Sequence, residues 1–175
     1  MRYLSVLVLA LTASFTAPDA RAQNQLELSA GRKITGSVYR PLTARTYQRQ
    51  AINHAQVLNY YGRSNSTVPT ETAQEHAVEV RRNLTSSQKE ISKLKTELKD
   101  DAEAQKLIAQ IEDHNKKAVE HCGMLDAECA KQAPQGTAVS SCCADMLKEL
   151  QAADAAHEQL LKHLKISVHA EHSKK

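Results

Sequence analysis

The chain has 175 residues, with 23 basic against 20 acidic side chains, 41% hydrophobic residues and only 3% aromatic ones. Its few glycines and prolines, 5 and 4 respectively, favour helices and argue against a β-sandwich or β-barrel, which would need many turns and β-branched runs. The charge is almost balanced and no basic stripe is interleaved with aromatic residues, so we expect no nucleic-acid partner.

Residues 1–22 have the features of a secretory signal peptide. Arg2 is followed by an apolar run, and Ala20-Arg21-Ala22, with small residues at its first and third positions, predicts cleavage before Gln23. The apolar run is too short to span a bilayer, and nothing downstream is longer or more apolar; an uncleaved membrane anchor is the alternative. We therefore expect a secreted or periplasmic protein of about one domain, with no membrane span once the signal is removed.

An arm and four helices are predicted after the signal peptide. Residues 23–42 look extended and end near Pro41. Beyond them, apolar side chains recur every three or four residues, which is the spacing of a helix face packed in a bundle. Gly62, Pro69 and Gly136 interrupt this pattern and separate the helices. The predicted helices are 43–61, 69–98, 101–131 and 139–165.

Short turns join the four helices, and helices joined in this way pack as antiparallel neighbours. We therefore predict an all-α fold: an antiparallel up-down-up-down four-helix bundle over residues 43–165, preceded by the extended N-terminal arm. Residues 166–175 lose the apolar period and are predicted to be a flexible tail.

Several histidines fall on the helix faces that should point into the bundle. Antiparallel neighbours can be aligned by counting residues from their shared turn, at about 1.5 Å of rise per residue. This alignment places His54, His76 and His121, from three helices, within about one helical turn of one another. Cys122 adjoins this level, and the fourth helix contributes Met146 or Leu147 to it. A single buried histidine is usually just hydrogen-bonded, whereas three at one level indicate a shared ligand.

A second level combines His114 with Asp154 and His157. Imidazoles buried side by side cost free energy unless their nitrogens have partners. A transition metal is such a partner, and imidazole with cysteine or methionine sulfur suits copper or zinc. Non-covalent haem between two histidines is the alternative cofactor, whereas covalent haem is excluded because the C-x-x-C-H motif is absent.

All four cysteines, Cys122, Cys129, Cys142 and Cys143, belong to the third and fourth helices. An even number of cysteines in an exported protein indicates disulfides first. Counting from the turn near Pro134 places Cys129 opposite Cys142 or Cys143; we expect the remaining member of that pair to bond to Cys122, and the alternative is that Cys122 remains a thiol. The alternative is that the thiols bind a soft metal or exchange disulfides.

The sequence contains no nucleophile with a base, no phosphate-binding loop and no paired catalytic carboxylates. An enzyme would need a metal with an open coordination position at the three-histidine level. The leading hypothesis is therefore an exported bundle that carries or buffers copper or zinc through interior histidines. The alternative is a structural or interaction protein of the cell envelope, linked by disulfides, that binds another envelope protein and no metal.

Overall fold

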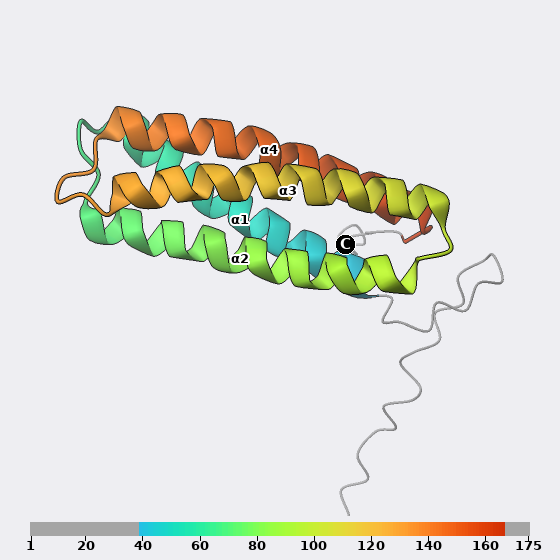
Figure 1. The fold of residues 1–175 in the computed structure, drawn as a ribbon. Coiled ribbons are helices and arrows are strands. Elements are labelled where there is room, and N and C mark those ends of the chain that lie inside the picture. Colours follow the sequence, from blue (N-terminus) through green and yellow to red (C-terminus); the bar gives the residue numbers. More distant parts are fainter. Residues whose placement is uncertain (1–38, 167–175) are drawn as a thin grey trace, which may run out of the picture.

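The computed structural model describes residues 39–166, which form four helices lying side by side (Figure 1). Helix α1 spans Tyr39–Ser64, α2 Thr70–Glu97, α3 Ala102–Cys129 and α4 Gly136–His163. No strand occurs between residues 39 and 166, so the all-α class and the bundle of four helices are confirmed for this range. No helix in the same range is long and apolar enough to cross a bilayer. The predicted signal peptide, residues 23–38 of the arm and the tail from residue 167 lie outside the described residues.

The first helix begins earlier than predicted, because residues 39–42 of the expected arm are helical. Proline is tolerated in the first helical turn, where its missing N–H would have no partner anyway, and Pro41 is buried there. Arg40 fastens this turn to α2 through ion pairs with Glu90 at 2.6 Å and Glu97 at 3.0 Å. Charged contacts therefore extend the helix beyond the apolar period from which it was predicted.

Each helix packs against two others: α1 contacts α2 and α4, and α3 contacts the same two. The contacts run in opposite directions along α1 and α2, since Arg40 pairs with Glu90 whereas His54 lies against His76. Helices α1 and α3 therefore occupy one diagonal of the bundle, and α2 and α4 occupy the other.

The α1–α2 loop and the α3–α4 loop meet at one end of the bundle (Figure 1). The backbone N–H of Val68 donates to the carbonyl of Pro134 at 2.9 Å, and that of Gly136 donates to the carbonyl of Ser66 at 2.8 Å. A Cβ atom on Gly62 would lie 2.5 Å from the carbonyl oxygen of Gly136. Gly62 was predicted to follow the end of the first helix, but it lies inside α1 and allows this close approach to α4.

The buried core consists of two apolar clusters with a polar level between them. Gln48, Ser87 and Asn115, from α1, α2 and α3, are completely buried at this level. The amide of Gln48 donates to the carbonyl of Leu150 at 3.1 Å, and the hydroxyl of Ser87 donates to that of Ala44 at 3.0 Å. The largest fully buried members of the cluster near the joined loops are Leu58, Leu84, Leu125, Met146 and Leu150, and those of the other cluster are Ile91, Leu94, Ile108, Ile111 and Leu160.

Candidate metal centre

Two of the predicted histidines meet at the interface between α1 and α2. The Nδ1 atoms of His54 and His76 lie 2.9 Å apart, and their ring centroids are separated by 5.2 Å with the planes tilted by 48°. Both side chains are half-buried. At this distance one Nδ1 donates a proton and the other accepts it, so the pair holds one shared proton between two helices.

The surroundings of His76 favour its uncharged form. Burial and then the neighbouring ring of His54 lower the pKa of His76, while Glu75 and Glu79 act weakly in the opposite direction. Neutral imidazole is the form that binds transition metals. With metal–nitrogen bonds of about 2.0–2.1 Å, two nitrogens at the observed separation subtend about 90° at a common ion, and a separation of about 3.3 Å would reach the tetrahedral angle. A small outward movement of either ring would therefore bring the two nitrogens to the separation that tetrahedral coordination of one ion requires.

The third predicted histidine, His121, faces a different interface. His114, His121 and Glu128 are spaced seven residues apart and therefore share one side of α3. That side faces α4, because His114 lies 2.8 Å from the carboxylate of Glu149 on α4 and Glu128 accepts from the backbone N–H of Gln135 at 3.0 Å.

Of the three histidines expected at one level, His54 and His76 therefore meet in the structure, and His121 does not join them. Within residues 39–166, no three side chains of His, Cys, Asp or Glu are grouped so that they could hold an ion together. Counting residues from a turn gives the height of a side chain in the bundle, but it does not tell which of two interfaces the side chain faces. His121 belongs to α3, which lies diagonally opposite α1 and makes no contact with it, and it lies on the side of α3 that faces α4 and not α2, the helix of His76.

The two sulfur atoms that were expected beside the histidines instead face each other between α3 and α4. The Sγ atom of Cys122 lies 3.2 Å from the Sδ atom of Met146. Both residues are buried, with 2% and 0% of their surfaces exposed. Cys129 and Cys143 belong to the same apolar cluster, and Cys142 packs against its edge.

All four cysteines are free thiols in the structure. The predicted disulfides from Cys129 and from Cys122 to Cys142 or Cys143 are therefore absent, which corrects the prediction from the sequence. Three of the four thiols fill core positions as small apolar side chains. Burial raises the pKa of Cys122 and of Cys129 to about 11, and it raises that of Cys143 further. These thiols stay protonated near neutral pH, which suppresses thiol exchange.

The second predicted level does not form a site. The Arg45 guanidinium donates two hydrogen bonds to Asp154, at 2.8 and 3.2 Å, and His114 pairs with Glu149. His157 is only 1% exposed, and neither of its ring nitrogens has a hydrogen-bond partner. Residues three apart on a helix share a side only approximately. Here Asp154 points to Arg45, whereas His157 points into the core.

Sequence reasoning missed the basic partners of the carboxylates on α4. Arg45 and Arg49 are four residues apart on α1, and Asp154 and Glu158 are four apart on α4. Arg45 pairs with both carboxylates, and Arg49 approaches Asp154 at 3.4 Å. This matched spacing of opposite charges is a signal that the sequence contains, and it accounts for Asp154 without a metal.

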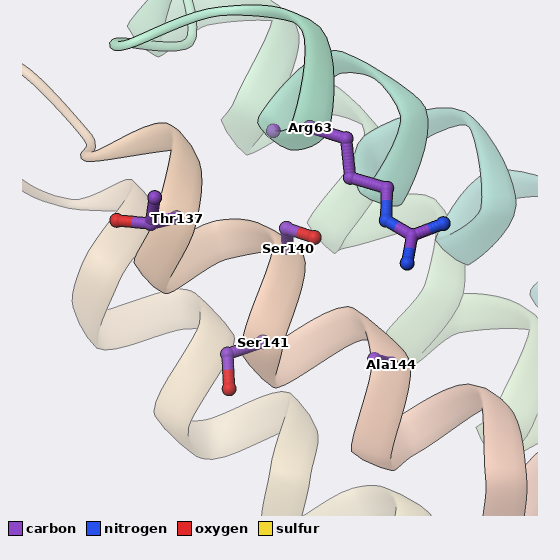
Figure 2. Close-up of a pocket in the computed structure, with 6 residues that line it drawn as sticks. Arg63, Thr137, Ser140, Ser141 and Ala144 are labelled. Atoms are coloured by element: carbon purple, nitrogen blue, oxygen red, sulfur yellow. The ribbon is translucent and has the colours of Figure 1, made fainter.

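A shallow groove of about 490 Å³ lies where the end of α1 packs against the beginning of α4. Figure 2 shows the guanidinium of Arg63 on the α1 side and the hydroxyl groups of Thr137, Ser140 and Ser141 along α4. The Ser140 hydroxyl already donates to the side-chain carbonyl of Asn59 at 2.8 Å. None of these groups is a usual ligand of copper or zinc.

Among the described residues, the structure thus brings two histidine nitrogens together at one interface and two sulfur atoms together at another, and both kinds of atom can bind transition metals. The nitrogen pair, His54 and His76, connects α1 to α2, and the sulfur pair, Cys122 and Met146, connects α3 to α4. The chain matches no known protein-family model, no curated protein and no solved structure.

Proposed function

We propose that this protein is exported and, as an antiparallel up-down-up-down bundle, carries or buffers a copper or zinc ion at His54 and His76. The observation that supports this function most directly is the 2.9 Å separation of the two Nδ1 atoms. Two imidazoles so close cannot both be protonated without strong repulsion between like charges. A metal ion takes the place of the shared proton and satisfies both nitrogens at once.

The helices that carry the two histidines are held in a fixed register, which favours chelation. Arg40 pairs with Glu90 at the beginning of α1. Near the histidines, the buried residues Ala51, Ala55 and Ala77 present only methyl groups, which allows α1 and α2 to approach closely. A ligand pair that is positioned before binding loses little conformational freedom when the ion arrives.

The small number of protein ligands fits transport or buffering better than a structural role. Structural zinc sites are closed by four protein ligands, whereas sites with open positions keep water or an exchangeable ligand. His54 and His76 supply two ligands and are half-buried. Solvent can therefore complete the coordination shell, and the ion can enter and leave without unfolding of the bundle.

Titration of zinc into the purified full chain without a histidine tag tests this proposal. We expect one ion to bind at this pair, and His54→Ala or His76→Ala to weaken its binding at least tenfold. His114→Ala is the matched control, because His114 is also half-buried but pairs with Glu149 on another interface. Equal zinc affinity in the wild type and in the double variant of His54 and His76 would refute the proposed site.

A second function, as a metal-free interaction protein of the envelope, is favoured by one observation. Tyr39, Tyr60 and Tyr61, all on α1, are 54%, 70% and 38% exposed, and tyrosine is enriched in protein interfaces. This function needs no ion. The metal content of protein purified from its natural compartment therefore distinguishes the two functions. An interaction protein would contain no more metal than the double variant of His54 and His76 does.

A further inference from the structure

The sulfur pair lies deep in the core, where the packing of the bundle requires apolar side chains but no sulfur atoms. Cys122 and Met146 are 2% and 0% exposed and belong to the apolar cluster near the joined loops. Their sulfur atoms approach to 3.2 Å, although a thiol and a thioether form only a weak hydrogen bond. Leucine or alanine would fill such positions with less chemical reactivity.

We propose that Cys122 and Met146 form a second metal site, separate from the histidine pair, which binds a soft monovalent ion such as cuprous copper. The ion is bound by the thiolate of Cys122 and the thioether of Met146. Cys143, one turn before Met146 on α4, belongs to the same apolar cluster. This site does not depend on the function proposed for His54 and His76.

The apolar surroundings select the charge of the ion. Binding breaks the S–H bond of Cys122, releases its proton to solvent and forms a sulfur–metal bond, without any change of oxidation state. A monovalent ion and one thiolate together carry no net charge, so their burial avoids most of the desolvation cost of an isolated charge. A divalent ion at the same two ligands would leave one uncompensated positive charge inside the core. Thiolate and thioether sulfur also prefer cuprous copper.

The geometry requires only a modest movement of one flexible side chain. Metal–sulfur bonds are about 2.3 Å long, so two sulfurs on one ion are about 3.8 Å apart at the tetrahedral angle and about 4.6 Å apart in a linear arrangement. The observed 3.2 Å must therefore increase. Met146 is able to make this adjustment, because methionine is unbranched and has three rotatable side-chain bonds.

The helix that carries Cys122 has a weak point directly beside the site. Gly123 follows Cys122 directly, inside α3, and a Cβ atom placed on it would have no neighbour within 4 Å. Packing therefore does not require a glycine at this position. A glycine in the interior of a helix weakens it by about 0.5–1 kcal/mol relative to alanine, so α3 opens more readily at this point, next to the buried thiol.

Cuprous titration of the reduced full chain without oxygen, in competition with a chromophoric chelator, tests the site. We expect Met146→Leu to lower cuprous affinity at least tenfold and Cys122→Ala to remove the thiolate-to-metal charge-transfer band of the first equivalent. Met124→Leu and Cys142→Ala are the matched controls, because Met124 is 59% exposed and Cys142 is only partly buried. Both controls should bind as the wild type does.

The two metal sites can fail separately in this experiment. His54→Ala should leave the thiolate-to-metal charge-transfer band of the first cuprous equivalent unchanged, because that band belongs to the sulfur site, and Met146→Leu should leave zinc binding unchanged. Circular dichroism establishes that each variant is folded, and Met146→Leu, which conserves volume, decides the matter if Cys122→Ala is unfolded. A folded Met146→Leu variant with wild-type cuprous affinity would overturn the proposal.

Discussion

His157 is the residue at which burial and chemistry conflict most strongly. It is 1% exposed, and both ring nitrogens lack a hydrogen-bond partner in the structure. Burial lowers the pKa of His157 to about 4; Asp154 opposes this effect, and Arg45 on α1 adds to it. Arg45 is itself neutralised by Asp154 and Glu158. The imidazole is therefore uncharged in the folded protein throughout the neutral range.

This pKa predicts a stability that depends on pH. Between pH 6.5 and pH 4 the unfolded chain binds a proton at His157 that the folded chain does not bind. The contribution of His157 to the free energy of unfolding is therefore fully present above pH 6.5 and falls as the pH decreases towards 4, by about 3 kcal/mol over the interval. Urea unfolding at several pH values measures the free energy of unfolding of the wild type and of His157→Leu. In the difference between the two proteins, the contributions of the other titrating groups cancel. Parallel pH profiles for the two proteins would contradict the prediction.

At the scale of single helices, α3 contains a weak point that packing does not explain. Gly123 lies within α3 and has open space where a Cβ atom would be. We predict that Gly123→Ala raises the free energy of unfolding by about 0.5–1 kcal/mol, because alanine restricts the unfolded chain and clashes with nothing. Denaturant unfolding measures the gain. Gly62→Ala is the contrasting variant: its Cβ atom would lie 2.5 Å from the backbone of α4, so it should be destabilised.

The helices themselves were predictable, because apolar periods extend over many turns and glycine or proline separates them. The predicted segments 69–98 and 101–131 differ from α2 and α3 by at most two residues at each end. The beginning of α1 was not predictable from apolar spacing, since Arg40 stabilises it through charge. The alignment that placed His54 beside His76 depended on one short turn. Within one helical hairpin, two core-facing side chains at the same height face the same interface. His121 lies in the other hairpin, so a matching height did not ensure that it faces the interface between α1 and α2.

The cysteines show a different limit of sequence reasoning. Their number and their position beside one turn predicted disulfides, yet the structure has Cys122 against Met146 and leaves all four thiols free. Cysteine is both a half of a disulfide and a small apolar side chain, and spacing along the sequence does not distinguish these roles. Only the direction of each Cβ atom in the packed bundle decides between them.

For the whole molecule, the polar level between the two apolar clusters limits stability. Asn115 is completely buried, and neither its amide nitrogen nor its side-chain oxygen has a hydrogen-bond partner in the structure. A buried unsatisfied polar group costs about 1–3 kcal/mol. Asn115→Leu should therefore raise the free energy of unfolding by about that amount, as thermal or urea unfolding will measure. Gln48→Leu should not do so, because its amide donates to the carbonyl of Leu150; equal gains in both variants would refute this distinction.

The placement of each proposed metal site within a single pair of consecutive helices has a consequence for the time course of biosynthesis. His54 and His76 are both present once α2 has been made, whereas Met146 belongs to the last helix. Chains are synthesised from the N-terminus, and early segments fold while later ones are still being added. The imidazole pair is therefore complete while the sulfur pair still lacks one member, and an ion that reaches the nascent chain meets nitrogen ligands first.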